Sequence, residues 1–320
     1  NKLTQYDKLT GDFQSQLQSE INLGHFNTAR YLLEAIQNVF WIKIGKKPDW
    51  NDNPFKDVTN QYLAENDIKG IDSTPNLSAT SIQTYNECPL KYKYRFIDRI
   101  PGEPEKPYFK LGKVIHKVLE VFHDKNYQTF EDLTTLLDKY WQEGGYHYEQ
   151  EKEQNLQDAE TMLKNYWDYI QINPVEKLYT EHEFTFETDY ATLSGKCDRI
   201  DLDENGNVSI VDYKTSKSAK TERELKKDIQ LGIYALFMLL NGLDTAENKN
   251  IKKIPDKLSM LFLREDKPEV AVELTQSDLD KFEGKIKDTS NGIRKGEFPA
   301  CKGQYCEWCD YRELLCPVFG

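Results

Sequence analysis

Two aspartates and a lysine stand out because their spacing can bring them together on two neighbouring strands. Asp198 lies in the segment LSGKCDRIDL, and Asp212 and Lys214 lie in NVSIVDYKTS. Side chains two residues apart on a strand point to the same face, so Asp212 and Lys214 share one. Converging carboxylates repel each other unless a cation lies between them, and a divalent ion with oxygen ligands meets that need. The Lys214 ammonium can then stabilise developing charge on a phosphate or orient a water.

The D-x-K tripeptide alone has an ordinary explanation, because a solvent-facing aspartate with a salt-bridging lysine is common. The neighbouring residues favour a functional role. Val208, Ile210 and Val211 form a largely apolar strand, and Asp212 interrupts it at its end. A polar break in a buried strand usually serves function.

The elements that must position these residues follow from periodicity and turn signals. The segment LYTEHEFTFET alternates with period two and predicts a strand before LSGKCDRIDL, and Asn205-Gly206 predicts a hairpin turn before NVSIVDYKTS. Two further strands are expected in KLSMLFLRED and EVAVELT. Helical patterns precede the first strand, follow the third and end the chain, so we expect an α/β fold with a mixed central sheet flanked by helices.

The run GKCDRID followed by IVDYKTS resembles the RecB-like nucleases of the PD-(D/E)xK superfamily. The resemblance implies a restriction-endonuclease-like core in which Asp198, Asp212 and Lys214 are catalytic. It also implies activity as a Mg²⁺- or Mn²⁺-dependent deoxyribonuclease, expected to be an exonuclease on single strands or DNA ends. One departure is Cys197, which stands where an apolar residue is usual; a small buried cysteine serves the same packing role.

Further positions match the same family in chain order. Gly112-x-x-x-His116 resembles its metal-binding histidine, and Gln230-x-x-x-Tyr234 follows the D-x-K strand on a predicted helix. Residues four apart share a helix face, so Gln230 and Tyr234 can reach one cleft, where the resemblance gives them catalytic roles. The implied metal ligands are His116, Asp198, Asp212 and the backbone carbonyl of Tyr213. A strand glutamate of the family is matched loosely by Glu183.

The resemblance covers the chain unevenly. Residues 1–75 lie outside it; their apolar periodicity predicts a helical accessory segment, which carries no chemical motif and can be the tail of a preceding domain. The RecB-like nuclease domain is expected over residues 76–320, with a helical insertion at about residues 126–177 and a cysteine cluster at its C-terminal end.

Four of the six cysteines lie between residues 301 and 316, which is too dense for packing alone. Cys306, Cys309 and Cys316 have a spacing typical of a zinc or iron–sulfur site. The spacing leaves the fourth ligand open between Cys301 and Cys88. The iron–sulfur branch of the family, which includes helicase–nucleases and CRISPR-associated exonucleases, has a Cys-Pro motif before the core. The resemblance therefore implies a [4Fe–4S] cluster on Cys88, Cys306, Cys309 and Cys316.

Basic and aromatic residues alternate after Cys88, which suits a surface that binds DNA. The expected contacts are Lys91, Tyr92, Lys93 and Arg95. A second basic run follows the D-x-K strand, from Lys214 to Lys227. Part of any such run is usually an ordinary solvated face, and some of the tyrosines must belong to the core.

Composition limits the alternatives. The 320 residues are 38% hydrophobic, enough for a packed core, and the net charge of −12 excludes a basic footprint over the whole protein. No apolar stretch is long enough to span a membrane and the first residues do not form a signal peptide, so a cytoplasmic location is expected. The chain lacks a G-x-x-x-x-G-K-[ST] phosphate loop, so it should not hydrolyse ATP.

Three functions remain after these exclusions. The leading one is the DNA nuclease, which the resemblance pairs with a helicase domain or subunit in DNA repair or recombination. The second is a catalytically inactive iron–sulfur scaffold that binds DNA within a helicase–nuclease complex. The third is a zinc-bound interaction module without a nucleic-acid partner.

Overall fold

The computed structural model describes residues 2–43, 74–102, 107–141, 149–174, 177–245, 250–312 and 315–319. The chain divides into two compact units. Unit 1 takes residues 1–104, 189–191 and 286–320, and unit 2 takes residues 105–188 and 192–285. This division differs from the boundary at residue 75 that the sequence suggested.

Unit 2 contains a mixed sheet, as predicted. Its strands lie in the order β2, β3, β4, β7, β8, and they comprise β2 (Lys177–Glu187), β3 (Thr192–Leu202), β4 (Val208–Lys214), β7 (Lys257–Phe262) and β8 (Glu269–Val272). Pairing is antiparallel except between β4 and β7, which run parallel. The predicted turn between β3 and β4 contains Gly206 at a φ of 79°, a conformation that favours glycine. A small second sheet pairs β5 (Leu243–Asp244) with β6 (Asn250–Ile251).

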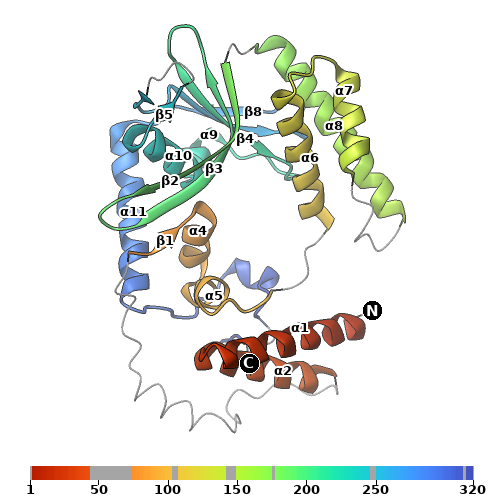
Figure 1. Ribbon diagram of the computed structural model, residues 1–320, viewed down its shortest axis with the longest axis vertical. Helices are drawn as coiled ribbons and strands as arrows, with labels where there is room; N and C mark the ends of the chain where they lie inside the picture. Colours follow the sequence, from red (N-terminus) through yellow and green to blue (C-terminus); the bar gives the residue numbers. More distant parts are fainter. Residues whose placement is uncertain are drawn as a thin grey trace. The chain divides into compact units, whose positions relative to one another are not determined.

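Three helices cover one face of this sheet. They are α6 (Pro107–Asp124), α7 (Phe130–Tyr140) and α8 (Glu149–Ile172), which lie side by side (Figure 1). Their apolar side chains form one core with Val211 and Tyr213 of β4 and with Leu261 and Leu263 at the end of β7. The expected insertion at residues 126–177 thus contains α7 and α8, apart from residues 142–148 and 175–176, which lie outside the described part.

On the other face lie α9 (Glu222–Leu225), α10 (Ile229–Leu240) and the first half of α11 (Gln276–Arg294). Phe237 of α10 stacks on Phe184 of β2 with ring centroids 4.4 Å apart. Gly232 of α10 allows a close approach to α11, because a Cβ there would lie 2.5 Å from the Phe282 ring. Unit 2 therefore has helix, sheet and helix layers, with the ends of β3 and β4 enclosed between them.

Unit 1 is built mainly from helices: α1 (Lys2–Asn22), α2 (Phe26–Lys43), α4 (Ala79–Glu87), α5 (Pro89–Tyr92), the π-helix η1 (Lys93–Ile97), the end of α11 and the 3₁₀-helix η2 (Gln304–Trp308). The two-residue strand β1 (Asn76–Leu77) also belongs to it. Its core joins Phe13 and Leu32 to Tyr94 and Tyr311. Two buried hydroxyls bond backbone carbonyls across this core, Tyr94 to Leu315 at 3.0 Å and Tyr311 to Ile100 at 2.9 Å.

None of the helices in the described ranges has the length and apolar character needed to cross a membrane.

Candidate active site

A cleft of about 1100 Å³ opens in unit 2 between α6, α8, the middle of β2 and β3, and the end of β4. His116, Asp198, Asp212, Lys214 and Gln230 all line it, so residues that are far apart in the sequence meet in one place as predicted. The remaining predicted catalytic residue, Tyr234, lies beneath them and is 2% exposed.

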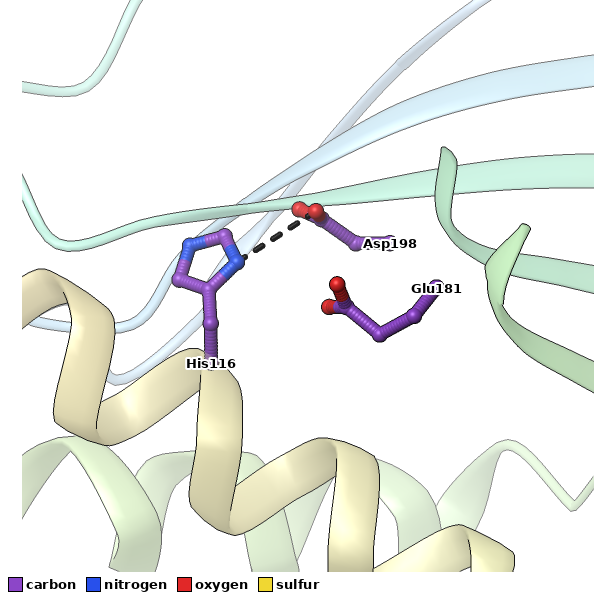
Figure 2. Close-up of side chains that lie close together, drawn as sticks. All are labelled: His116, Glu181 and Asp198. Carbon is purple, nitrogen blue, oxygen red and sulfur yellow. Dashed lines mark ion pairs between the residues drawn. The ribbon is translucent and has the colours of Figure 1, made fainter. Parts of the chain in front are cut away.

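One side of the cleft holds a group of three possible metal ligands. The donor atoms of His116, Glu181 and Asp198 all lie within 4.8 Å of one another. His116 Nδ1 is 3.3 Å from Asp198 Oδ1, and Figure 2 shows the three side chains reaching inward from α6, β2 and β3. α6 can approach closely because Gly112 has no side chain; a Cβ there would lie 3.2 Å from Thr215 Oγ1.

Glu181 is a site residue that periodicity missed. It has a φ of 47°, in the left-handed region that non-glycine residues rarely adopt, and it has no partner in the register between β2 and β3. At this position the ladder between β2 and β3 is interrupted opposite Asp198, and the register is the same on both sides of the interruption. The Glu181 side chain lines the cleft and forms an ion pair with Lys196. Glu183, the loose match to the family, is instead exposed. No sequence signal marks the unusual backbone conformation of Glu181.

The second side of the cleft is a closed hydrogen-bond network around Asp212. Its Oδ1 accepts bonds from Gln230 Nε2 at 2.7 Å and from the Tyr234 hydroxyl at 3.1 Å. Gln230 Oε1 in turn accepts a bond from Lys214 Nζ at 2.9 Å. The i, i+4 spacing of Gln230 and Tyr234 therefore does bring both to Asp212.

The other oxygen of Asp212 pairs with the lysine of the D-x-K triplet. Oδ2 is buried, and Lys214 Nζ lies 2.6 Å from it as an ion pair. Burial of Asp212, opposed by Lys214 and reinforced by the charge of Asp198, raises the pKa of Asp212 to about 6. A carboxylate that is costly to ionise without extra positive charge is suited to bind a cation.

The charged neighbours shift other pKa values in the cleft. Burial alone would lower the pKa of His116, but the hydrogen bond to Asp198 and the charges of Asp198, Asp212 and Glu181 together outweigh burial and raise it. Burial likewise opposes the charged form of Lys214, and Asp212 reverses the effect, so its pKa is raised. Burial is the main reason that the pKa of Glu181 is raised. The carboxylates of the site thus lie close together, which disfavours their charged forms, and a bound cation would stabilise those forms.

A buried polar cluster supports the site from behind. The Tyr213 amide donates to Asp198 Oδ2 at 2.7 Å, and the Tyr213 hydroxyl lies 3.0 Å from that of Tyr166 on α8. Arg199, 1% exposed, donates to Tyr166 at 3.0 Å and is also paired with Asp201. Tyr213 thereby connects the D-x-K strand to α8, and its ring also contacts that of His116.

Two of the predicted DNA-binding residues are not available at the surface. Tyr92 and Lys93 are buried in unit 1, 4% and 9% exposed, and Lys93 pairs with Asp98 at 2.6 Å. This corrects the expectation that they form an exposed DNA-binding surface, since Tyr92 at the end of α5 and Lys93 at the start of η1 both lie in the core. Arg95 is exposed, and Lys91 is half-buried near Glu87.

The five cysteines considered as cluster ligands all belong to unit 1. Cys301 is exposed, whereas Cys88, Cys306, Cys309 and Cys316 are half-buried. Burial raises the pKa of the Cys309 thiol, and the nearby Cys88 adds to the effect. In the described ranges, no three thiols come as close together as the three ligands of the cleft.

Comparison with known proteins gives one family. Residues 76–317 match the family described as the PD-(D/E)XK nuclease superfamily. No curated protein sequence matches the chain.

Solved structures with a similar arrangement are distant in sequence. They include the protein named "Putative exonuclease" from Eubacterium rectale (14% identity, 80% of this chain and 93% of that one, TM-score 0.46) and SSO0001 (12% identity, 85% and 100%, TM-score 0.37). Protein VC1899 from Vibrio cholerae is 10% identical over 68% of this chain and 56% of its own, with a TM-score of 0.22. These identities and TM-scores are too low to assign a property of those proteins to this chain.

Proposed function

Because this chain belongs to the PD-(D/E)XK nuclease superfamily, we propose that unit 2 hydrolyses phosphodiester bonds in DNA with Mg²⁺ or Mn²⁺ and acts as an exonuclease on single strands or ends. The observation that carries the proposal is the meeting of Asp198, Asp212 and Lys214 in one cleft, with Lys214 Nζ paired to the buried Oδ2 of Asp212.

The donor set fits a divalent cation. Carboxylate oxygens are the ligands that Mg²⁺ and Mn²⁺ prefer, and an imidazole suits Mn²⁺. Asp198 and Asp212 would hold the ion together with His116 and the Tyr213 carbonyl. We add Glu181 to these ligands because its carboxylate lies beside His116 and Asp198. A bound ion supplies Lewis-acid stabilisation of the charge that develops on the phosphate and lowers the pKa of a water nucleophile.

The protein groups around Asp212 position the reacting atoms. Lys214 contacts Gln230 and Asp212, and these contacts fix its side chain in one conformation with the ammonium facing the cleft. From there it can stabilise the extra negative charge on a phosphate oxygen during in-line attack. Gln230 and Tyr234 fix the Asp212 carboxylate, which leaves Oδ2 in one orientation.

The preference for single strands or ends rests on burial. Asp212 is 1% exposed, so a scissile phosphate must enter the cleft rather than lie across its rim. A flexible strand or a frayed end can do so more readily than an intact duplex.

We extend the proposal to a [4Fe–4S] cluster on Cys88, Cys306, Cys309 and Cys316. Two features support this choice over Cys301: the exposure of Cys301, and the position of Cys88 beside Cys309. Thiolates are the usual ligands of such clusters. Cluster assembly would connect α4 and α5 to the residues after α11 within unit 1. The resemblance also supports a helicase partner in DNA repair or recombination.

The test is metal-dependent cleavage of labelled single-stranded DNA by protein purified without oxygen. Wild-type protein should cleave with Mn²⁺ or Mg²⁺, and Asp212→Asn and Lys214→Gln should not. Asp203→Asn in the exposed β3–β4 turn is the matched control and should behave as wild type. Metal binding without cleavage by wild-type protein would instead favour the inactive scaffold. Colourless protein containing zinc would contradict the iron–sulfur cluster.

A further inference from the structure

A group of five cations projects from unit 2 directly after the catalytic strand. We call it the basic ridge, and it consists of exposed residues: Lys217, Lys220, Arg223, Lys226 and Lys227. Residues 215–228 contain these five cations against three acidic residues, in a chain whose net charge is −12. The cleavage chemistry proposed above does not use the ridge.

Two of the three acidic residues of this segment, Glu224 and Asp228, are engaged in local contacts. Glu224 accepts from the Thr221 amide at 2.7 Å in a capping box at α9, and Asp228 accepts from the Gln230 amide at 2.9 Å as the cap of α10. Only Lys220 is paired, with Asp228 at 2.6 Å. Within the described residues the other four cations form no ion pair, so the exposed side of the segment is positive.

The ridge is a built structure rather than a loose loop. At its start, Arg264 donates to the Thr215 carbonyl at 3.0 Å and pairs with Asp158 of α8. At its far end, Leu225 is 0% exposed, and α9 packs against β8. Side chains presented from a fixed backbone lose less entropy when they bind a ligand.

The ridge continues the active-site cleft. Lys217 is one of the cleft-lining residues and follows Lys214 by three positions, and the rest of the ridge leads from there to the start of α10. A polynucleotide whose scissile phosphate lies at Lys214 carries further phosphates at regular spacing, and exposed cations in a row match that pattern.

From these observations we infer that the basic ridge binds the phosphate backbone of the single-stranded part of the substrate outside the cleft. The inference rests on the proposed nuclease function for the position of the strand. It assigns the ridge a role in affinity for long substrates, separate from the chemistry at Asp212.

The test measures binding rather than cleavage. Full-length Asp212→Asn protein would be titrated with labelled single-stranded oligonucleotides of about 5 and about 25 nucleotides, chosen to lie below and above typical site sizes. The ridge variant carries Arg223→Gln, Lys226→Gln and Lys227→Gln. The control carries Lys125→Gln, Lys139→Gln and Lys267→Gln, which are exposed residues of unit 2 outside the cleft lining. Both sets change the net charge equally, and thermal melting checks that both variants fold.

The ridge variant should lose most of the affinity gained from the short to the long oligonucleotide, and the control should keep it. The slope of log affinity against log salt should fall by about 2, since each lost phosphate contact on a single strand removes about 0.7. Equal behaviour of the two variants would overturn the inference. So would equal competition by duplex DNA or by a polyglutamate peptide.

The two proposals fail in different ways. If wild-type protein binds long oligonucleotides through the ridge but does not cleave with metal, the nuclease proposal fails and the ridge stands. If it cleaves while the ridge variant binds like the control, the ridge inference fails alone.

Discussion

The cleft of unit 2 and the cysteines of unit 1 are two candidate metal sites that are organised in opposite ways. In the cleft, Asp212 is fixed by Gln230 and Tyr234, and Asp198 is fixed by the Tyr213 amide. The thiol of Cys306 contacts two backbone groups among the described residues, the Gly303 amide at 3.4 Å and the Cys301 carbonyl at 3.7 Å. Hydrogen bonds between side chains thus organise an oxygen site in advance, whereas a thiolate site relies on its metal for order.

The comparison predicts that ligands in unit 2 affect the cleavage rate and that ligands in unit 1 affect stability. The strongest test is the isosteric change Asp198→Asn. The cleavage rate should fall on the order of 10³-fold, because a ligand and a negative charge are lost. Thermal stability should stay the same or rise, because repulsion with Asp212 is relieved and the Tyr213 amide keeps an acceptor. Single-turnover kinetics and calorimetry measure both. A smaller effect on the rate than that of Cys309→Ala would reverse the comparison.

A second test concerns unit 1 alone. Cys88→Ala should remove bound iron and lower the melting temperature, because metal binding to a thiolate site contributes folding free energy. Cys301→Ala should do neither, since that thiol is exposed. Metal content per chain and melting curves, recorded without oxygen, give the readout. Iron retained by Cys88→Ala but lost by Cys301→Ala would move the fourth ligand to Cys301.

Within the cleft, the hydrogen-bond network should matter less than the ligands. Gln230→Leu removes one hydrogen bond to Asp212 and one from Lys214. It should reduce metal affinity or activity by about 10–100-fold. Gln276→Leu, at an exposed position on α11, is the matched control. Titration with Mn²⁺ separates the two effects. An unchanged affinity and rate would show that Asp212 needs no support.

The smallest predicted effect lies in the cluster behind the site. Burial, with the nearby Arg199, lowers the pKa of His123 to about 3, and His123 contacts the Tyr166 hydroxyl. An unfolded chain binds a proton to this histidine near pH 6.5 while the folded chain does not, so stability falls as the pH drops from about 6.5 toward 3.

The free energy of unfolding should change by about 1 kcal/mol per pH unit in this range. This is less than the full value for one proton because solvent screens part of the interaction. The variant His123→Gln should lack this component. Urea unfolding at neutral and at mildly acidic pH tests it, and parallel curves for the two proteins would contradict it.

The sequence predicted the sheet and most of the cleft for clear reasons. In β4, Asp212 breaks a largely apolar run, and Asn205-Gly206 marks the turn that joins β4 to β3. The family motifs brought in His116, Gln230 and Tyr234, which the fold places around the aspartates as expected.

Two features were beyond the reach of periodicity. Glu181 adopts a left-handed backbone conformation where the ladder between β2 and β3 is interrupted, and alternation within β2 gives no warning of it. The π-helix η1 buries Lys93, whose charge is satisfied by Asp98 and by contact with the Tyr31 ring. Both features depend on contacts made in the folded chain, which a local pattern does not contain.

The way the chain alternates between the two units has a consequence for its synthesis. Unit 1 takes residues from three separate stretches, and its core needs Tyr311 and Leu315 as well as Phe13 and Leu32. All of unit 2 is therefore synthesised before the last residues of unit 1 are available to complete its core. The N-terminal helices must wait with apolar surface exposed, a state in which chaperones commonly bind nascent chains.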